Sequence, residues 1–120
     1  MTRPTRGQLE AAVTAAISSF EREHLGRGPR EARTHLINDM VLVRLQGILS
    51  PAEQQLSFES GGVELIKQMR SRLVESSAEQ LRALIELHTG VPVRSQHTDL
   101  STRTGERIFL FTLEREPDIH

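Results

Sequence analysis

Apolar residues recur every three or four positions over residues 6–25, which predicts an amphipathic helix. The stripe is made of Leu9, Val13, Ile17, Phe20 and His24. Thr5 and Gln8 have the spacing of a capping box, in which each side chain bonds the other residue's backbone. The charged residue Glu21 is assigned to the outward face, and Gly26 suits the position that follows a helix end.

A change to alternating apolar and polar residues predicts two strands, over residues 32–37 and 40–47. Asn38-Asp39 forms the turn, since both residue types tolerate a positive φ. The resulting register gives one core-facing set: Ala32, Thr34, Leu36, Val41, Val43 and Leu45. On the other face Arg33 lies opposite Arg44, so splaying into water, a carboxylate or a bound anion must relieve their repulsion.

The sequence pattern in the middle of the chain predicts two more helices. Residues 50–53 (Ser-Pro-Ala-Glu) combine a capping box with a proline in the first turn. Gly61-Gly62 ends this short helix, and a long one follows over residues 63–89. Its apolar stripe is Ile66, Met69, Leu73, Ser77, Leu81 (or Gln80), Leu84 and His88. Charged residues, including Arg70, are assigned to its outward face, and Ser76-Ser77 interrupts the stripe where a bend is expected.

A second hairpin closes the chain, with strands over residues 91–100 and 106–113 and Gly105 in the loop. The last strand is apolar on both faces, which indicates a central strand or a face covered by a partner. We therefore expect a homodimer.

These elements predict one α+β domain over residues 1–120, a two-layer sandwich in the order α-β-β-α-α-β-β. Its four-stranded, mostly antiparallel sheet has the long helix packed on it. The core is expected over about residues 6–114, followed by a flexible tail at 115–120 that contains Pro117.

Composition removes several classes of function. A net charge of −1 and an aromatic content of 3% argue against a nucleic-acid-binding surface. The chain has no cysteine, so disulfides and thiolate chemistry are excluded. No stretch approaches the ~18 apolar residues of a membrane span, so direct membrane insertion is not expected. Of the 15 basic residues only Lys67 is a lysine.

The most distinctive run is Leu-Gly-Arg-Gly-Pro-Arg-Glu-Ala-Arg at residues 25–33. This run connects a helix to a strand through a bend, and it places several arginines close together. Clustered guanidinium groups beside a bent backbone are suited to binding an anion. A rigid connector with solvated arginines is the alternative interpretation. The candidate ligand-binding residues are Arg27, Gly28, Arg33, His35 and Arg44.

A weaker metal-site hypothesis uses His97 and Asp99, which share one strand face, together with His35 of the other hairpin. Hydrogen-bonded surface residues are the alternative. No Gly-x-Ser-x-Gly elbow, Walker loop or dinucleotide fingerprint is present, so neither an enzyme nor a cofactor is expected.

Several short runs share one family resemblance. They are Leu25–Pro29 with Ala32-Arg33, Leu49–Glu53, Arg70 and Arg72, Thr89–Val93, Asp99, and Phe109–Phe111. In this order they resemble the MpsC-like family of small bacterial proteins, the YbcI type. The resemblance covers about residues 7–114.

This resemblance implies a role beside a sodium-translocating, membrane-potential-generating system, although the family was long catalogued as a domain of unknown function. Some members look associated with bicarbonate uptake. The implied protein is a non-enzymatic accessory or regulatory factor in the cytoplasm, peripheral to the membrane through a transporter subunit. The alternative is an anion- or small-ligand-sensing homodimer that uses the arginine-rich connector and hairpin face.

Overall fold

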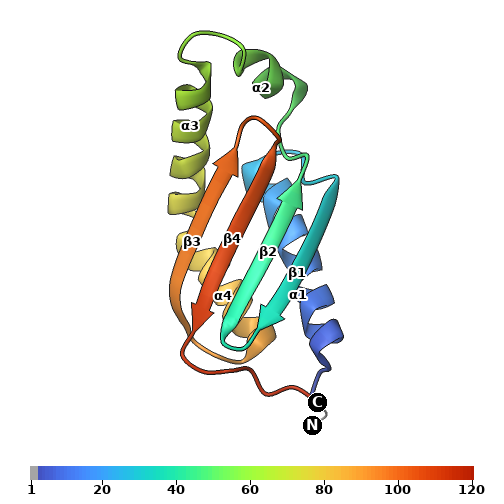
Figure 1. Cartoon of the computed structure of the whole chain (residues 1–120). Coiled ribbons are helices and arrows are strands. Elements are labelled where there is room, and N and C mark those ends of the chain that lie inside the picture. Colours follow the sequence, from blue (N-terminus) through green and yellow to red (C-terminus); the bar gives the residue numbers. More distant parts are fainter. Residues whose placement is uncertain (1–2) are drawn as a thin grey trace.

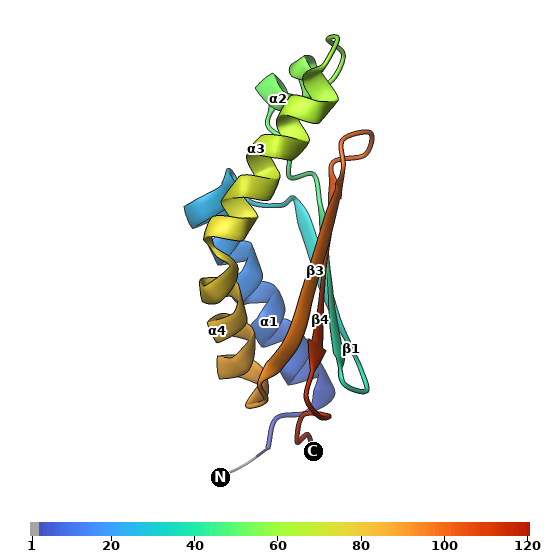
Figure 2. The same cartoon turned by 90° about the vertical axis from the view of Figure 1, so that its left-hand side faces the viewer.

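Four antiparallel strands form one sheet, in the spatial order β1-β2-β4-β3, and helices cover only one of its faces (Figures 1 and 2). The strands are β1 (Glu31–Ile37), β2 (Met40–Gln46), β3 (Val93–Ser101) and β4 (Glu106–Leu113). This computed structural model describes residues 3–120. The α+β class and the two-layer arrangement predicted from the sequence are confirmed.

The helical layer consists of α1 (Arg6–Phe20), the π-helical turn η1 (Glu21–Leu25), α2 (Pro51–Leu56), α3 (Gly62–Ser76) and α4 (Ala78–Thr89). Figure 2 shows α1 and α4 alongside the sheet, with α2 and the start of α3 extending past its end. The molecule is therefore elongated, measuring 53 × 24 × 22 Å.

The first hairpin has the predicted register. Leu36 pairs with Val41 on the core side, and Arg33 pairs with Arg44 on the open side. Asn38 has a φ of 55°, the left-handed conformation that the two-residue turn requires. Both predicted capping boxes are also present, at the starts of α1 and α2.

The end of the first helix differs from the prediction. The Gly26 N–H donates to the carbonyl of Glu21, five residues earlier, over 2.9 Å. Such a turn takes one more residue than an α-helical turn and shifts the apolar stripe. His24 is consequently exposed and Leu25 buried. Glu21 also lies inside, at 1% exposure instead of facing outward, because it follows Ile17 at α-helical spacing.

The predicted long helix is divided at Ser77, whose φ of −109° and ψ of 9° separate α3 from α4. Its buried face also differs from the predicted stripe. Met69 is 46% exposed, whereas Arg70, expected outside, is 3% exposed. Ile66, Arg70 and Val74 make the buried row because Arg70 finds carboxylate partners there.

The segment after β4 lies against the start of the chain. Pro117 is buried and Ile119 packs against the core. Asp118 pairs with Arg3 over 3.0 Å, and the His120 N–H donates to the carbonyl of Pro4 over 2.8 Å. These contacts hold the two ends of the chain together at the base of the molecule, where both lie in Figure 1.

Candidate functional site

The structure brings together three of the five predicted ligand-binding residues. Arg33, His35 and Arg44 line a shallow depression of about 300 Å³ on the open sheet face. Arg27 and Gly28 do not line it. Arg27 instead donates to the carbonyl of Gly47 over 3.2 Å.

Carboxylates of the chain itself offset the predicted repulsion between the paired arginines. Arg44 Nε lies 2.6 Å from Glu106 Oε2, and Arg33 Nε lies 3.7 Å from Glu31 Oε1. An internal counter-charge is one of the three explanations anticipated for this arginine pair. The depression therefore contains balanced charges, and the pair does not require an external anion.

The hypothesised metal site does not assemble. His35 lies on β1 and the pair His97 and Asp99 on β3, at opposite edges of the sheet. Three strand spacings, about 14 Å in total, separate them. Among residues 3–120 no group of three His, Asp or Glu side chains could hold a metal ion. Strand order, which the sequence pattern did not determine, decides this outcome.

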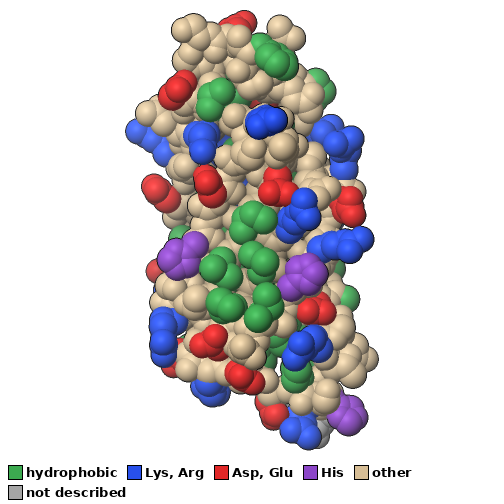
Figure 3. Space-filling view, in the orientation of Figure 1, with side chains coloured by type: hydrophobic (Ala, Val, Ile, Leu, Met, Phe, Trp, Pro, Cys, Tyr) green, Lys and Arg blue, Asp and Glu red, His purple; other side chains and the backbone are tan. Residues whose placement is uncertain are grey.

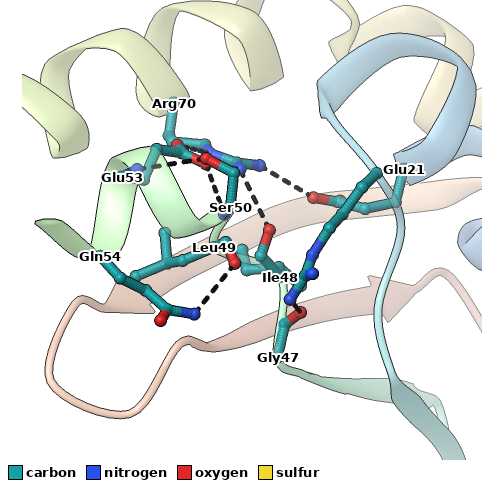
Figure 4. A network of polar contacts seen from close by, with 9 residues as sticks. Glu21, Gly47, Ile48, Leu49, Ser50, Glu53, Gln54 and Arg70 are labelled. Atoms are coloured by element: carbon teal, nitrogen blue, oxygen red, sulfur yellow. Dashed lines mark hydrogen bonds and ion pairs between the residues drawn. The ribbon is translucent and has the colours of Figure 1, made fainter.

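The structure places a different constellation between the helices and the sheet, which we call the buried charge cluster: Glu21, Glu53, Arg70 and Arg107. Arg70 is its centre (Figure 4). Its Nε and Nη2 bind the two oxygens of Glu53 over 2.8 and 2.7 Å, a bidentate pair. Its Nη1 donates to Glu21 Oε1 over 3.2 Å, and Nη2 also reaches the Ile48 carbonyl over 3.2 Å.

Local sequence features position these partners. Glu53 is also the third residue of the α2 capping box, so its carboxylate accepts from the Ser50 N–H over 3.0 Å while it binds Arg70. Glu21 points inward because it lies four residues after the buried Ile17, at α-helical spacing. Gly26 leaves room for the guanidinium, since a Cβ there would lie 3.3 Å from Arg70 Nη2. The connector predicted to hold an external anion thus borders the chain's own arginine.

Arg107 completes the cluster from β4. It faces the helices with Leu45 and Leu100 as cross-strand neighbours and is 2% exposed. Its Nη1 donates to Thr98 Oγ1 over 3.0 Å, and its guanidinium carbon lies 5.4 Å from the ring centre of Phe109. Within residues 3–120, Arg107 Nε and Nη2 and Glu21 Oε2 have no hydrogen-bond partner.

Burial and ion pairing have opposite effects on the pKa values of these groups. Burial raises the pKa of Glu21 more than the charges of Arg107 and Arg70 lower it. Burial also acts to raise the pKa of Glu53, but hydrogen bonds from Arg70 and Ser50 outweigh it and lower that pKa below 4.5. The same pairing raises the pKa of Arg70 despite its burial. Arg70 therefore stays charged and joins η1, α2 and α3.

Because the two pKa shifts differ in sign, they give opposite pH dependences. A lowered pKa in the folded state means that the unfolded state binds the proton more readily. The contribution of Glu53 to the free energy of unfolding is therefore lost as pH falls below about 4.5. The Glu21 contribution is present at low pH and lost as pH rises through its raised pKa. In urea unfolding series from pH 3 to 7, we expect Glu53→Gln to flatten the acid limb and Glu21→Gln to steepen it. Identical pH profiles for both variants and the wild type would contradict this assignment.

One sequence signal could have found Arg107: it alternates in step with Phe109, Phe111 and Leu113 on a single strand face. Arg70 had a weaker signal, since it lies four residues from both Ile66 and Val74. Neither position says which carboxylates lie opposite, because those come from distant elements.

The family model described as "Na+-translocating membrane potential-generating system (MpsC)" matches residues 5–115. The chain belongs to the MpsC family. This family member is also 43% identical over 111 residues to "Uncharacterized protein YbcI" of Bacillus subtilis (strain 168). The alignment covers 92% of this chain and 90% of the relative. No solved structure matches the chain. The resemblance noted from the sequence motifs is confirmed.

Proposed function

We propose that this MpsC family member is a non-enzymatic accessory or regulatory protein of a membrane system that transports Na⁺ or bicarbonate. The family description supports a link to a Na⁺-translocating, membrane-potential-generating system. Within residues 3–120 no helix is long and apolar enough to cross a bilayer. In this proposal a membrane partner contains the ion path, and the protein binds that partner from the cytoplasm.

The uncovered face of the sheet carries the proposal. Its middle holds an apolar patch, which we call the open-face patch: Met40, Leu42, Ile108 and Leu110, all partly exposed. Figure 3 shows these apolar side chains gathered at the centre of the face, with charged residues and histidines around them. A contiguous apolar surface rimmed by polar groups is typical of a protein-binding surface.

A second copy of the chain fits this face by symmetry. One row across the four strands reads Arg33, Arg44, Ile108, Asp99. A two-fold axis parallel to the strands reverses each row, so Asp99 of one copy meets Arg33 of the other while the apolar centres coincide. Packed sheets lie about 10 Å apart, a distance that the long side chain of Arg33 spans toward Asp99. We therefore place a homodimer contact on the open-face patch.

Light scattering tests the dimer directly. At micromolar concentration we expect a mass twice the 13.5 kDa of one chain. Leu110→Arg should give the monomer mass, because a charge would be buried at the centre of the contact. Leu87→Arg is the matched control, since Leu87 is 78% exposed on α4 and away from the sheet. A monomeric wild type, or equal masses for the two variants, would rule out this interface.

The membrane partner is tested by affinity capture from solubilised membranes of the source organism. We expect the tagged protein to retain a subunit of an ion or bicarbonate transporter, identified by mass spectrometry. Leu87→Arg should retain the same subunit. Recovery of cytoplasmic proteins alone would contradict the accessory role while leaving the dimer result intact.

A further inference from the structure

A small cavity of about 40 Å³ lies between α3 and the β3–β4 hairpin, beside the buried charge cluster. Its lining includes Lys67, Arg70, Thr98, Asp99 and Arg107. Three of these side chains are cationic and one is a carboxylate. A water molecule occupies about 30 Å³ in the liquid, so the cavity holds only a very small guest.

One residue that lines the cavity, Arg107, carries unused hydrogen-bond donors. Arg107 is 2% exposed, yet its Nε and Nη2 have no partner within residues 3–120. Buried donors are almost always paired, since an unpaired one loses its hydration without compensation. The third nitrogen, Nη1, is already bound to Thr98 Oγ1.

The two unpaired donors, Arg107 Nε and Nη2, indicate which class of ligand the cavity could bind. The Nε–H and one Nη2–H of a guanidinium group point the same way along one planar edge, the fork that binds two oxygens of a single oxyanion. We propose that this edge of Arg107 binds a small planar oxyanion, of the size of formate or nitrate, inside the cavity. This site lies on the helix side of the sheet and shares only Asp99, at its mouth, with the proposed dimer contact, and its test does not depend on the proposed function.

Most of the nearby carboxylate oxygens are already engaged, and the exception, Glu21 Oε2, belongs to a residue that does not line the cavity. Asp99 Oδ1 accepts from the Leu100 N–H over 2.8 Å and pairs with Lys67 over 3.4 Å. Glu53 and one oxygen of Glu21 are held by Arg70. The cavity therefore keeps the Arg107 edge and the Lys67 ammonium as its attractive groups for an incoming anion.

Access comes from the Lys67–Asp99 side. The side chains of these residues are 45% and 84% exposed, whereas Arg70 and Arg107 lie at the buried end. An exposed ion pair contributes little to stability, so it separates readily to admit a small ion. Lys67 then becomes a second cationic partner for the guest.

Titration with formate tests the site in a gluconate buffer of constant ionic strength, because gluconate is too large for the cavity. We expect the 13C-formate line to broaden with wild-type protein, and the melting temperature to rise with the logarithm of formate concentration. Nitrate should compete. Arg107→Met should weaken formate binding at least tenfold, because both charge-assisted hydrogen bonds are lost.

If Arg107→Met fails to fold, a variant at the cavity mouth can be used in the same formate titration instead. Lys67→Gln should weaken formate binding several-fold, since it removes a lining cation from an exposed position. Arg72→Gln is the matched control, because it removes an equal charge from an exposed position of the same helix. An unbroadened formate line with wild type, or equal binding by the two variants, would overturn the proposal and assign the cavity to water.

Discussion

Arg70→Met is expected to lower the free energy of unfolding by about 3–5 kcal/mol, the usual cost of removing one partner from a buried ion pair. The side chain is 3% exposed and holds Glu53 through two hydrogen bonds and Glu21 through one. Methionine has a similar volume but cannot compensate either carboxylate. Urea denaturation followed by circular dichroism at pH 7 measures the change.

Two further variants show whether geometry or charge matters in this pair. Arg70→Lys keeps the charge but loses the planar fork that binds both oxygens of Glu53, so a smaller loss is expected. Arg72→Met, at an exposed position two residues away, should change stability by less than about 0.5 kcal/mol. A loss below 1 kcal/mol for Arg70→Met would mean that the cluster does not hold these elements together.

Gly28→Val is expected to cost about 1–3 kcal/mol from backbone strain, with a steric contribution in addition. Gly28 has a φ of 87°, a conformation that a β-branched residue rarely adopts. A Cβ at this position would also lie 2.3 Å from Cγ of Arg22. The same denaturation experiment measures the combined loss.

Two glycines elsewhere separate the two contributions. Gly61 has a φ of 76° with no atom within 4 Å of a built Cβ, so Gly61→Ala reports backbone strain alone. Gly7 lies in α1 with a helical φ and open space, and Gly7→Ala should stabilise by about 0.5–1 kcal/mol. Unchanged stability in Gly28→Val would show that position 28 does not require the left-handed conformation.

Much of the local structure was determined by the sequence alone. Capping boxes at Thr5 and Ser50 depend only on residues three positions apart, and both form as predicted. The Asn38-Asp39 turn sets the register of the first hairpin, including Arg33 opposite Arg44. Gly90, with a φ of 72°, ends the last helix where expected. These features are predictable because their partners are close along the chain.

The tertiary structure decided which charges are buried and which predicted sites can form. Arg70 and Glu21 were assigned to solvent because isolated charges avoid the core, but each finds a partner from a distant element. Conversely, His35 and His97 could share a site only if their strands were neighbours, and the order β1-β2-β4-β3 separates them. Burial of a charge depends on what lies opposite it in space, and residue periodicity along one element carries no information about that.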